Sequence, residues 1–304
     1  MTQPIRTAVI GLSHAATVHV PALQAHPRFQ LAAVASSRPG RAVEVARQRN
    51  VDRACEDWHE ALADPSIDLV VAASSVPART AQIQAALAAG KHVLAEPPLA
   101  ESIDELDALL AEARRAERVA AACFPLRYLS ARQALRELVC NGHLGTVRYA
   151  SWRQFSATWH PTAPVHAVDT LRWTLGGVEH ATVHRLKGDD ALYLQCRHAG
   201  GCVTQVVIDG DSPTEDFSFT IAGTGRAAMV IGDHPDVGEL HLVAGEVDDE
   251  YAVRPSPYQR FAAAHRHVPP MMELLDDLAA AIDGKVSTVP TMADAAEAQR
   301  IAGR

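Results

Sequence analysis

The first 124 residues alternate between apolar, β-branched segments and helix-like segments, and this alternation restricts the fold more than any other feature of the chain. The apolar segments span residues 5–10, 30–35, 68–73, 92–95 and 119–123. The helix-like segments between them span residues 15–25, 40–49 and 78–89, and a fourth begins at Ser102. Strands and helices that alternate along a chain form a parallel sheet with right-handed crossover connections. The sequence therefore predicts an α/β domain with a parallel sheet over residues 1–124.

Residues 125–304 follow a different pattern, in which strand-like segments succeed one another directly. A helix-like segment at 130–142 comes first. The strand-like segments then lie at roughly 146–157, 181–187, 191–197, 202–208, 215–222, 226–231 and 238–243. Strands without helices between them favour a mostly antiparallel sheet. The chain ends with two helix-like segments, so we expect an α+β domain with an open, mostly antiparallel sheet over residues 125–304.

Charge and cysteine usage exclude several classes of function. The formal net charge is -8 with a pI near 6.0, and no block of Lys and Arg offers the basic face that a nucleic-acid binder needs. The five cysteines are scattered and form no CxxC pair, which is typical of reduced thiols in a cytoplasmic protein. The N-terminal apolar run is too short for a signal peptide, and no run of about 18 apolar residues predicts a membrane span. We therefore expect a cytoplasmic protein whose partners include neither nucleic acid nor a membrane.

The stretch "AVIGLSHAATVH" (residues 8–19) has the outline of a dinucleotide-binding turn. Glycines in such a turn allow a tight bend, close approach of the diphosphate, and close packing of helix on strand. Gly11 occupies the first glycine position, Ser13 the second and Ala16 the third, and the Ser13 hydroxyl can donate to a phosphate oxygen. The cofactor-binding candidates in this turn are Gly11, Ser13, His14 and Ala15. An ordinary strand-to-helix turn is the alternative, because fingerprint matches are weak without context.

The end of the second apolar segment bears on the choice of nucleotide. An NAD site usually has Asp or Glu at this point for the adenine ribose, whereas Arg suits the 2′-phosphate of NADP. Here the stretch is "VASSRPGR", with no carboxylate but with Ser36, Ser37 and Arg38. This composition favours NADP, with NAD as the second choice; a polar loop with solvated arginines is the alternative. Ser74 and Ser75, after the third apolar segment, complete the set of cofactor-binding candidates.

Several stretches in order along the chain resemble the glucose–fructose oxidoreductase / inositol dehydrogenase family of NAD(P)-dependent enzymes. They are "GLSHAATVHVPAL", "VASSRPGRAVEVA", "AGKHVLAEPPLAESIDEL", "HLGTVRYASW", "GTGRAAMV" and "MMELLDDLAAAIDGK". The resemblance implies a Rossmann domain followed by a second domain whose open sheet forms oligomer contacts. It therefore implies a homodimer or homotetramer, and a small-molecule substrate.

The resemblance also implies catalytic positions, and this chain departs from the family at two of them. A typical member has Glu-Lys-Pro where this sequence has Glu96-Pro97-Pro98, so the lysine that polarises the reacting oxygen is replaced by a proline. His166 is kept, while Thr162 stands where the family tends to have Asp. Asp169 matches a second acidic position. The catalytic candidates are His166, Glu96 and Asp169, with Glu96 also adjoining the cofactor.

Five residues are candidates for the substrate cleft, and metal ligands are not expected. The substrate candidates are Arg127, Tyr128, Trp159, His160 and Thr162. The alternative for Tyr128 and Trp159 is simple packing, and for His160 an exposed loop. The fifteen histidines form no HxxxH pair with a third ligand in sight and there is no Cys cluster, so no metal ion is predicted. The "AAAHRH" run at 262–267 is interpreted as a polar surface segment, and His19 as structural.

These residues lead to one mechanistic hypothesis and two alternatives. The hypothesis is NADPH-dependent reduction of a C=N or activated C=O group with His166 as the proton donor, because an imine needs the missing lysine less than a ketone does. The first alternative is a nucleotide-binding sensor or regulatory protein without turnover. The second is the use of bound nicotinamide in non-redox chemistry.

Overall fold

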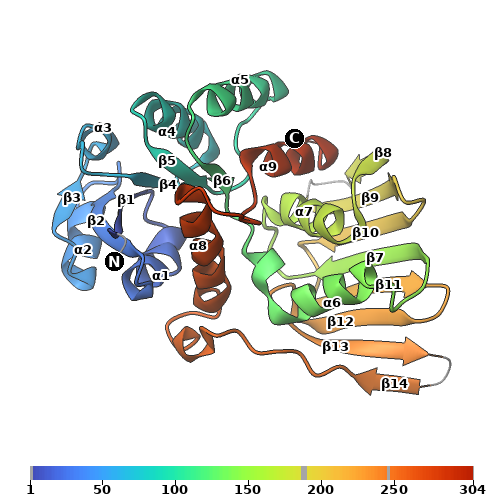
Figure 1. The fold of residues 1–304 in the computed structure, drawn as a ribbon. Helices are drawn as coiled ribbons and strands as arrows, with labels where there is room; N and C mark the ends of the chain where they lie inside the picture. The colour runs from blue at the N-terminus through green and yellow to red at the C-terminus, as the bar shows by residue number, and fades with distance from the viewer. Residues whose placement is uncertain (1–2, 186–189, 245–246, 304) are drawn as a thin grey trace. The chain divides into compact units, whose positions relative to one another are not determined.

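The computed structural model describes residues 3–185, 190–244 and 247–303, and these form two compact units (Figure 1). The first unit comprises the chain up to Pro125 together with Pro257–Glu297. The second comprises Leu126–Ser256 and Ala298–Gly303. The expected change of architecture near residue 124 thus coincides with the first division. The expected assignment of all of residues 125–304 to one domain differs from this division, because residues 257–297 belong to the first unit.

The first unit contains a six-stranded parallel sheet with the order β3-β2-β1-β4-β5-β6. Its strands are β1 (Ile5–Ile10), β2 (Phe29–Ala35), β3 (Arg53–Cys55), β4 (Leu69–Ala72), β5 (His92–Ala95) and β6 (Ala120–Ala122). All four residues of β4 are buried, as expected for a central parallel strand with both faces covered. The predicted parallel sheet is confirmed. The short edge strand β3 was not predicted, since three residues are too few to show a periodic pattern.

Helices follow the strands of this sheet in alternation. They are α1 (His19–Ala25), α2 (Arg41–Arg49), α3 (Trp58–Leu62), α4 (Val76–Ala88) and α5 (Ile103–Arg115), with a 3-10 turn η1 (His14–Ala16) before α1. The predicted capping box forms at α5, where Ser102 accepts from the backbone of Glu105 and Glu105 reaches back to Ser102. The helix expected over 15–25 begins only at His19. The Thr17 hydroxyl donates to the His14 carbonyl, which closes the 3-10 turn before the α-helix starts.

A helix distant in sequence covers α1 within the first unit. In α8 (Val268–Ile282), buried apolar residues pack toward the unit's core, and α1 is its main helical neighbour. The buried stripe includes Met271, Met272, Leu274, Leu275 and Leu278. Two ion pairs reinforce this packing, between His26 and Asp276 at 3.0 Å and between Arg28 and Asp283 at 2.9 Å. Chain order does not reveal which sheet a late amphipathic helix covers, which is why residues 257–297 were misassigned.

The second unit is built on an eight-stranded sheet with the order β14-β13-β12-β11-β7-β10-β9-β8. The strands are β7 (Val147–Phe155), β8 (Val178–Arg185), β9 (Ala191–His198), β10 (Val203–Asp209), β11 (Asp216–Gly223), β12 (Ala227–His234), β13 (Val237–Ala244) and β14 (Val247–Glu250). Every adjacent pair is antiparallel except β7 and β10. The mostly antiparallel sheet is confirmed; positions 186 and 187 of the expected strand lie outside the described residues.

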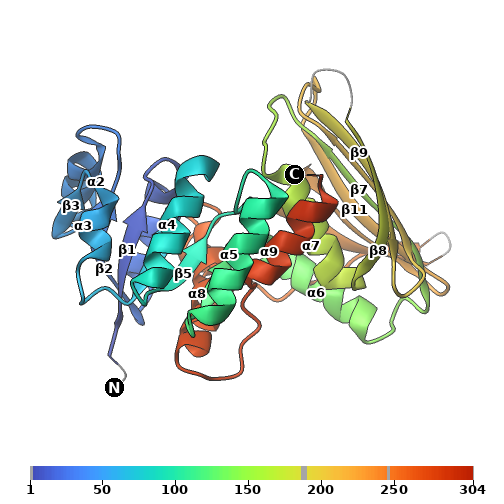
Figure 2. The ribbon, with the colours of Figure 1, turned by 90° about the horizontal axis from the view of Figure 1, so that it is seen from above.

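Two helices cover one face of this second sheet, and the other face lacks a helical layer among the described residues (Figures 1 and 2). They are α6 (Ser130–Cys140) and α7 (Ala163–Leu175), which contact strands of the sheet. No helix was predicted over 163–175, because Pro164 and several β-branched residues obscure the pattern; Pro164 lies in the first turn, where proline is tolerated. The final helix is α9 (Met292–Ile301). No helix of the described chain is long and apolar enough to cross a membrane.

Candidate functional site

The turn after β1 requires a glycine at its first position. Gly11 has φ +93°, and a Cβ there would lie 2.5 Å from the backbone of Ala73 and Ser74. Any side chain would therefore separate the turn from the loop after β4. This close approach is the role of the first glycine in a dinucleotide-binding turn. The geometry fits a nucleotide in which the backbone of this turn faces the diphosphate.

Ser13 stands at the second glycine position without a left-handed backbone. Its φ is -80°, so this position does not require the positive φ that favours glycine. The side chains of Ser13 and His14 are exposed, whereas Ala15 and Ala16 are buried. Ser13 and His14 thus remain accessible to a ligand, while Ala15 contributes to packing and offers its backbone only.

The two arginines that follow β2, Arg38 and Arg41, differ in their hydrogen bonds and in their exposure. The Arg41 guanidinium donates to the Leu12 carbonyl at 3.1 and 3.2 Å and to Glu44 at 2.9 Å, so it holds the glycine turn. Arg38 and Ser37 are exposed, and the Arg38 guanidinium donates no hydrogen bond within the described chain. Ser36 is largely buried, and its hydroxyl accepts from the Arg38 backbone at 3.2 Å. Of the two arginines, Arg38 is the one left accessible to a phosphate.

A buried arginine that the sequence analysis did not identify joins the ends of β4 and β5. Arg79, on α4, donates to the carbonyls of Ser74 at 2.5 Å, Glu96 at 2.9 Å and Pro98 at 2.6 Å. Ser75 precedes the same helix as its N-cap. Arg79 therefore fixes the backbone at two predicted cofactor-site positions. No local sequence signal indicates this role, since an arginine in an amphipathic helix usually lies in solvent.

Glu96 lies in a buried cluster with two further residues. His19 Nε2 lies 2.5 Å from Glu96 Oε1, with 1% of the His19 side chain and 19% of the Glu96 side chain exposed. Burial raises the pKa of the Cys123 thiol well above its usual range, and the charge and hydrogen bond of Glu96 raise it further. The thiol is thus a proton donor to Glu96. His19 and Cys123 were missed as partners because they come from different parts of the chain: His19 begins α1, and Cys123 follows β6.

The same three side chains could offer one ligand atom each to a metal ion, with these atoms all within 4.8 Å of one another. Their donor atoms already bond to each other, and the raised pKa of the thiol opposes the thiolate form that metals bind. Burial lowers the pKa of the neighbouring Arg79, while Glu96 and Cys123 raise it, so a cation already lies close by. The absence of a metal ion stays a prediction.

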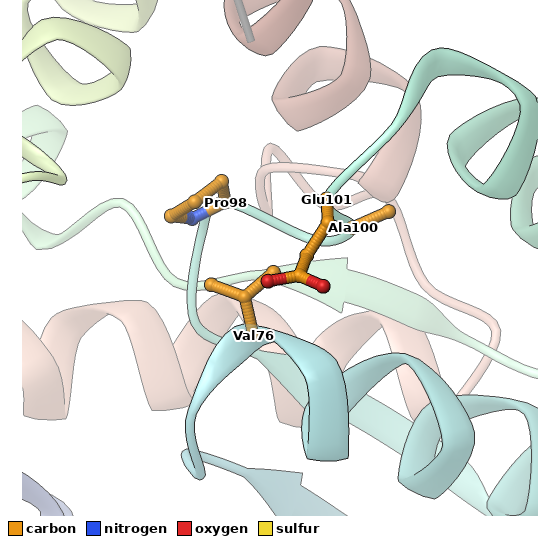
Figure 3. A pocket seen from close by; sticks show the side chains of 4 residues that line it. All are labelled: Val76, Pro98, Ala100 and Glu101. Carbon is orange, nitrogen blue, oxygen red and sulfur yellow. The ribbon is translucent and has the colours of Figure 1, made fainter.

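A small cavity of about 270 Å³ opens in the first unit (Figure 3). Val76, in the first turn of α4, lines it together with Pro98, Ala100 and Glu101 from the segment after β5. Figure 3 shows the Glu101 carboxylate extending over Val76. Ligands of open α/β sheets bind beyond the carboxyl ends of the strands, and this cavity lies at that end of β4 and β5. None of its lining residues was a predicted site residue.

In the second unit, two predicted site residues bind each other. Arg127, from the 3-10 turn η2 (Pro125–Tyr128), donates to Asp169 of α7 at 2.8 Å through Nε and at 2.5 Å through Nη2. The exposed fractions of the two side chains are 8% and 1%. A buried bidentate pair of this kind keeps both charges fixed. Arg127 and Asp169 therefore form a buried ion pair with each other.

His166 lies one turn before Asp169 on α7 and is half-buried. Its backbone N–H donates to the Thr162 carbonyl at 3.1 Å, and its own carbonyl accepts from the Thr170 hydroxyl at 2.9 Å. Thr162 is the N-cap of α7, but its side chain makes no capping hydrogen bond there. The helix thus fixes the backbone at His166 while both side chains stay partly accessible.

The remaining substrate candidates differ in exposure. Tyr128 is buried, with 7% of the residue exposed, in agreement with the packing alternative. Trp159 is half-buried, and its backbone lies so close to Gly210 that a Cβ there would be 2.4 Å from the Trp159 Cα. His160 is exposed, and its carbonyl accepts from the Ala163 backbone at the start of α7. Their contact with substrate stays a prediction.

Comparison with known proteins adds independent information. Residues 5–124 match a family model described as "Oxidoreductase family, NAD-binding Rossmann fold". The chain is 30% identical to the myo-inositol 2-dehydrogenase of Thermotoga maritima over 141 residues, which cover 46% of this chain and 42% of that protein. It is 24% identical to the 1,5-anhydro-D-fructose reductase of Ensifer adhaerens over 270 residues, 78% of this chain and 80% of that protein. The match to the Thermotoga protein thus spans less than half of that relative's length.

Solved structures extend the likeness to the second unit. A levoglucosan dehydrogenase in complex with NADH and levoglucosan matches with a TM-score of 0.85 at 20% identity, covering 99% of this chain and 95% of that chain. At this identity the match shows a shared fold, with a Rossmann-type parallel sheet and a second, mostly antiparallel sheet. The family match over residues 5–124 confirms the resemblance of the N-terminal sequence motifs: this part of the chain carries the NAD-binding Rossmann fold of the oxidoreductase family, to which the inositol dehydrogenase that it matches is similar.

Proposed function

We propose that this protein is an NADPH-dependent reductase of a C=N or activated C=O group in a small molecule. The observation that carries the proposal is the Gly11 turn, which tolerates no side chain at its first position and lies against the backbone of Ser74. Arg38, exposed after β2 where no carboxylate stands, supports a preference for the 2′-phosphate of NADP. NAD is the second choice of cofactor.

The cofactor preference is tested by comparing Arg38→Ala with Arg47→Ala, a change at an exposed arginine on α2. We expect the Arg38 variant to bind NADPH at least about tenfold more weakly, in line with loss of one charge-assisted hydrogen bond. Its affinity for NADH should not change, and the Arg47 variant should bind like the parent protein. Equal loss for both cofactors would show that Arg38 does not read the 2′-phosphate.

The proposed chemistry depends on one proton donor. A bound nicotinamide supplies the hydride. His166 gives its proton to the substrate nitrogen or oxygen as the carbon accepts the hydride, so that an imine becomes an amine or a carbonyl becomes an alcohol. Imidazole titrates near neutral pH and can be protonated again from solvent between turnovers. Pro97 offers no donor at the position of the family's lysine, which favours a substrate that is basic enough to be protonated before reduction.

Replacement of His166 by Ala tests this role. We expect turnover of imine and carbonyl substrates to be lost, while the dissociation constant of NADPH measured by calorimetry stays the same. His143→Ala, at an exposed position after α6, is the matched control and should retain full turnover. Turnover that survives the His166 change would refute the role of this residue as the acid.

A second candidate function follows from the two altered catalytic positions and from the pairing of Asp169 with Arg127. Pro97 and Thr162 replace polar groups, and Asp169 is held by Arg127. These features favour a protein that binds the nucleotide as a sensor or regulator, or that uses bound nicotinamide in non-redox chemistry. Nucleotide binding without oxidation of NADPH across a panel of imines and carbonyls would support this second function over the first.

Assembly and location complete the proposal. The face of the second sheet that lacks a helical layer exposes apolar side chains, including Tyr149 and Ile231. We propose that it pairs with another copy in a homodimer or homotetramer, and that the protein is cytoplasmic. Sedimentation of the native protein tests the assembly, and Ile231→Glu should shift it toward the monomer if this face is the interface.

A further inference from the structure

Three histidine rings lie together at the glycine turn of the first unit. His265 and His267 come from the segment before α8, and their ring centroids are 4.8 Å apart. The His14 ring, in the turn itself, lies 6.2 Å from His265 and 6.0 Å from His267. The run at 262–267 is therefore not merely a polar surface segment. It places two imidazoles beside the turn that the proposed function assigns to a diphosphate.

The charged groups around His14 come from several elements. Partial loss of solvent around its ring lowers the pKa of His14, the Glu96 carboxylate raises it, and His19, His267 and His265 lower it further, so that the net shift is downward. Arg266, between the other two histidines, is exposed, and the Arg41 guanidinium is engaged with the Leu12 carbonyl. Without an anion, the neighbouring imidazoles thus disfavour a proton on His14.

A bound anion reverses this preference. A diphosphate in front of the turn places negative charge beside all three rings, and an opposite charge nearby favours the protonated form of an imidazole. All three rings belong to the first unit. His14 is exposed, and His265 and His267 are half-buried, which leaves them accessible to the anion.

We propose that His14, His265 and His267 form a proton-linked site for the diphosphate of the nucleotide, which takes up a proton when the nucleotide binds. The inference rests on the proposed function, since it concerns the same nucleotide. Binding and protonation are linked equilibria, so affinity falls as pH rises through the histidine range. For one fully linked proton, the dissociation constant rises by up to about tenfold per pH unit.

The experiment is calorimetry of the full-length protein with NADPH at pH values from 6 to 8, in buffers of low and high ionisation enthalpy. The slope of the apparent enthalpy against buffer ionisation enthalpy gives the number of protons taken up. The 2′-phosphate of NADPH itself titrates near pH 6. Proton uptake is therefore read as the difference between the parent protein and the variant His265→Gln/His267→Gln.

We expect the parent protein to take up more protons than this double variant, by about half a proton or more near pH 6.5. The dissociation constant of the variant should depend less steeply on pH. The matched control is His59→Gln, an exposed histidine on α3, which should behave like the parent. Thermal melting of each variant shows that it is folded.

The outcomes separate the two proposals. Failure of NADPH and NADH to bind the folded parent protein would overturn the proposed function and this inference with it. Binding with the same proton uptake and the same pH dependence in parent and double variant would overturn the inference alone. Proton uptake that is smaller in the double variant than in the parent, but unchanged in the His59 variant, would support it.

Discussion

Glu96 and Asp169, both predicted to be catalytic, have opposite environments. The Glu96 side chain is 19% exposed and lies against a histidine and a thiol, His19 and Cys123. The Asp169 side chain is 1% exposed and accepts two hydrogen bonds from one guanidinium, that of Arg127. The two carboxylates have the same chemistry in the sequence. Their partners differ: Glu96 lies against an imidazole and a protonated thiol, whereas Asp169 lies against a guanidinium.

The two carboxylates face different kinds of charge. An arginine stays protonated at every pH that a protein tolerates, so Asp169 faces a constant positive charge. The Cys123 thiol, whose pKa is raised, keeps its proton and donates it in a hydrogen bond to Glu96. Asp169 therefore lies in a buried ion pair one helical turn from His166, whereas Glu96 lies against an imidazole and a thiol.

The largest expected effect is on the free energy of unfolding when the buried Arg127–Asp169 pair is broken. Asp169→Ala leaves the Arg127 charge buried without its partner, which should lower the free energy of unfolding by about 3–5 kcal/mol. Urea denaturation measures this. The control Asp211→Ala, at an exposed position after β10, should change stability by less than about 0.5 kcal/mol.

The double variant Arg127→Met/Asp169→Leu tests whether the buried pair contributes net stability. It removes both charges and keeps comparable volume, so it should be more stable than Asp169→Ala. If the double variant is the less stable of the two, the buried pair contributes net stability, and the comparison with Glu96 must be revised.

The next effect is on thiol reactivity near Glu96. Burial and the Glu96 carboxylate raise the pKa of Cys123, and Cys140 is the exposed one of the five cysteines. A disulfide reagent at pH 8 should label Cys140 at least about 100-fold faster than Cys123 in the native protein, since the thiolate is the nucleophile. Rapid labelling in a Cys140→Ser variant would show that the Glu96 cluster opens, and that it is less enclosed than its geometry indicates.

A smaller effect is expected at Glu96 itself. Glu96→Gln keeps the shape and an acceptor for His19 but removes the charge, so the free energy of unfolding should fall by about 1–2 kcal/mol. Urea denaturation beside Asp169→Ala is the measurement. If Glu96→Gln lowers the free energy of unfolding as much as Asp169→Ala does, the two acids do not differ as their environments indicate.

The smallest effect concerns an ion pair near the protein surface. Hydrogen bonds from Arg28 and Lys285 hold the pKa of Asp283 well below its usual range. Because this pKa is lowered on folding, the pair contributes stability above the ordinary Asp value of about 3.9 and loses it as pH falls further. Asp283→Asn should therefore reduce the drop in melting temperature between pH 6 and pH 3. Asp52→Asn, at an exposed position, is the control; an unchanged drop in the Asp283 variant would contradict the prediction.

Much of the fold could be predicted because its signals are local. The strands of the first sheet and the capping box at Ser102 follow from short apolar runs and from one side chain near a helix start. α3 and β3 were missed because they are too short for a period to show. The helix α7 was missed because Pro164 and its β-branched residues obscure the pattern, although it is buried along most of its length.

The candidate site was only partly predictable for a different reason. Gly11, Arg38 and Glu96 could be identified from their order after particular strands. His19, Arg79 and Cys123 could not be identified as partners of this region, because each reaches it from a separate element. Neither could the pairing of Arg127 with Asp169, which are 42 positions apart.

Periodicity, spacing and residue type along the chain were enough to predict the two architectures and the glycine turn. Only the folded protein shows that residues 257–297 join the first unit, that His265 and His267 lie beside His14, and that Asp169 pairs with an arginine. The physical reason is that charge state and accessibility depend on which groups surround a side chain. Those neighbours come from distant parts of the chain, and packing alone brings them together.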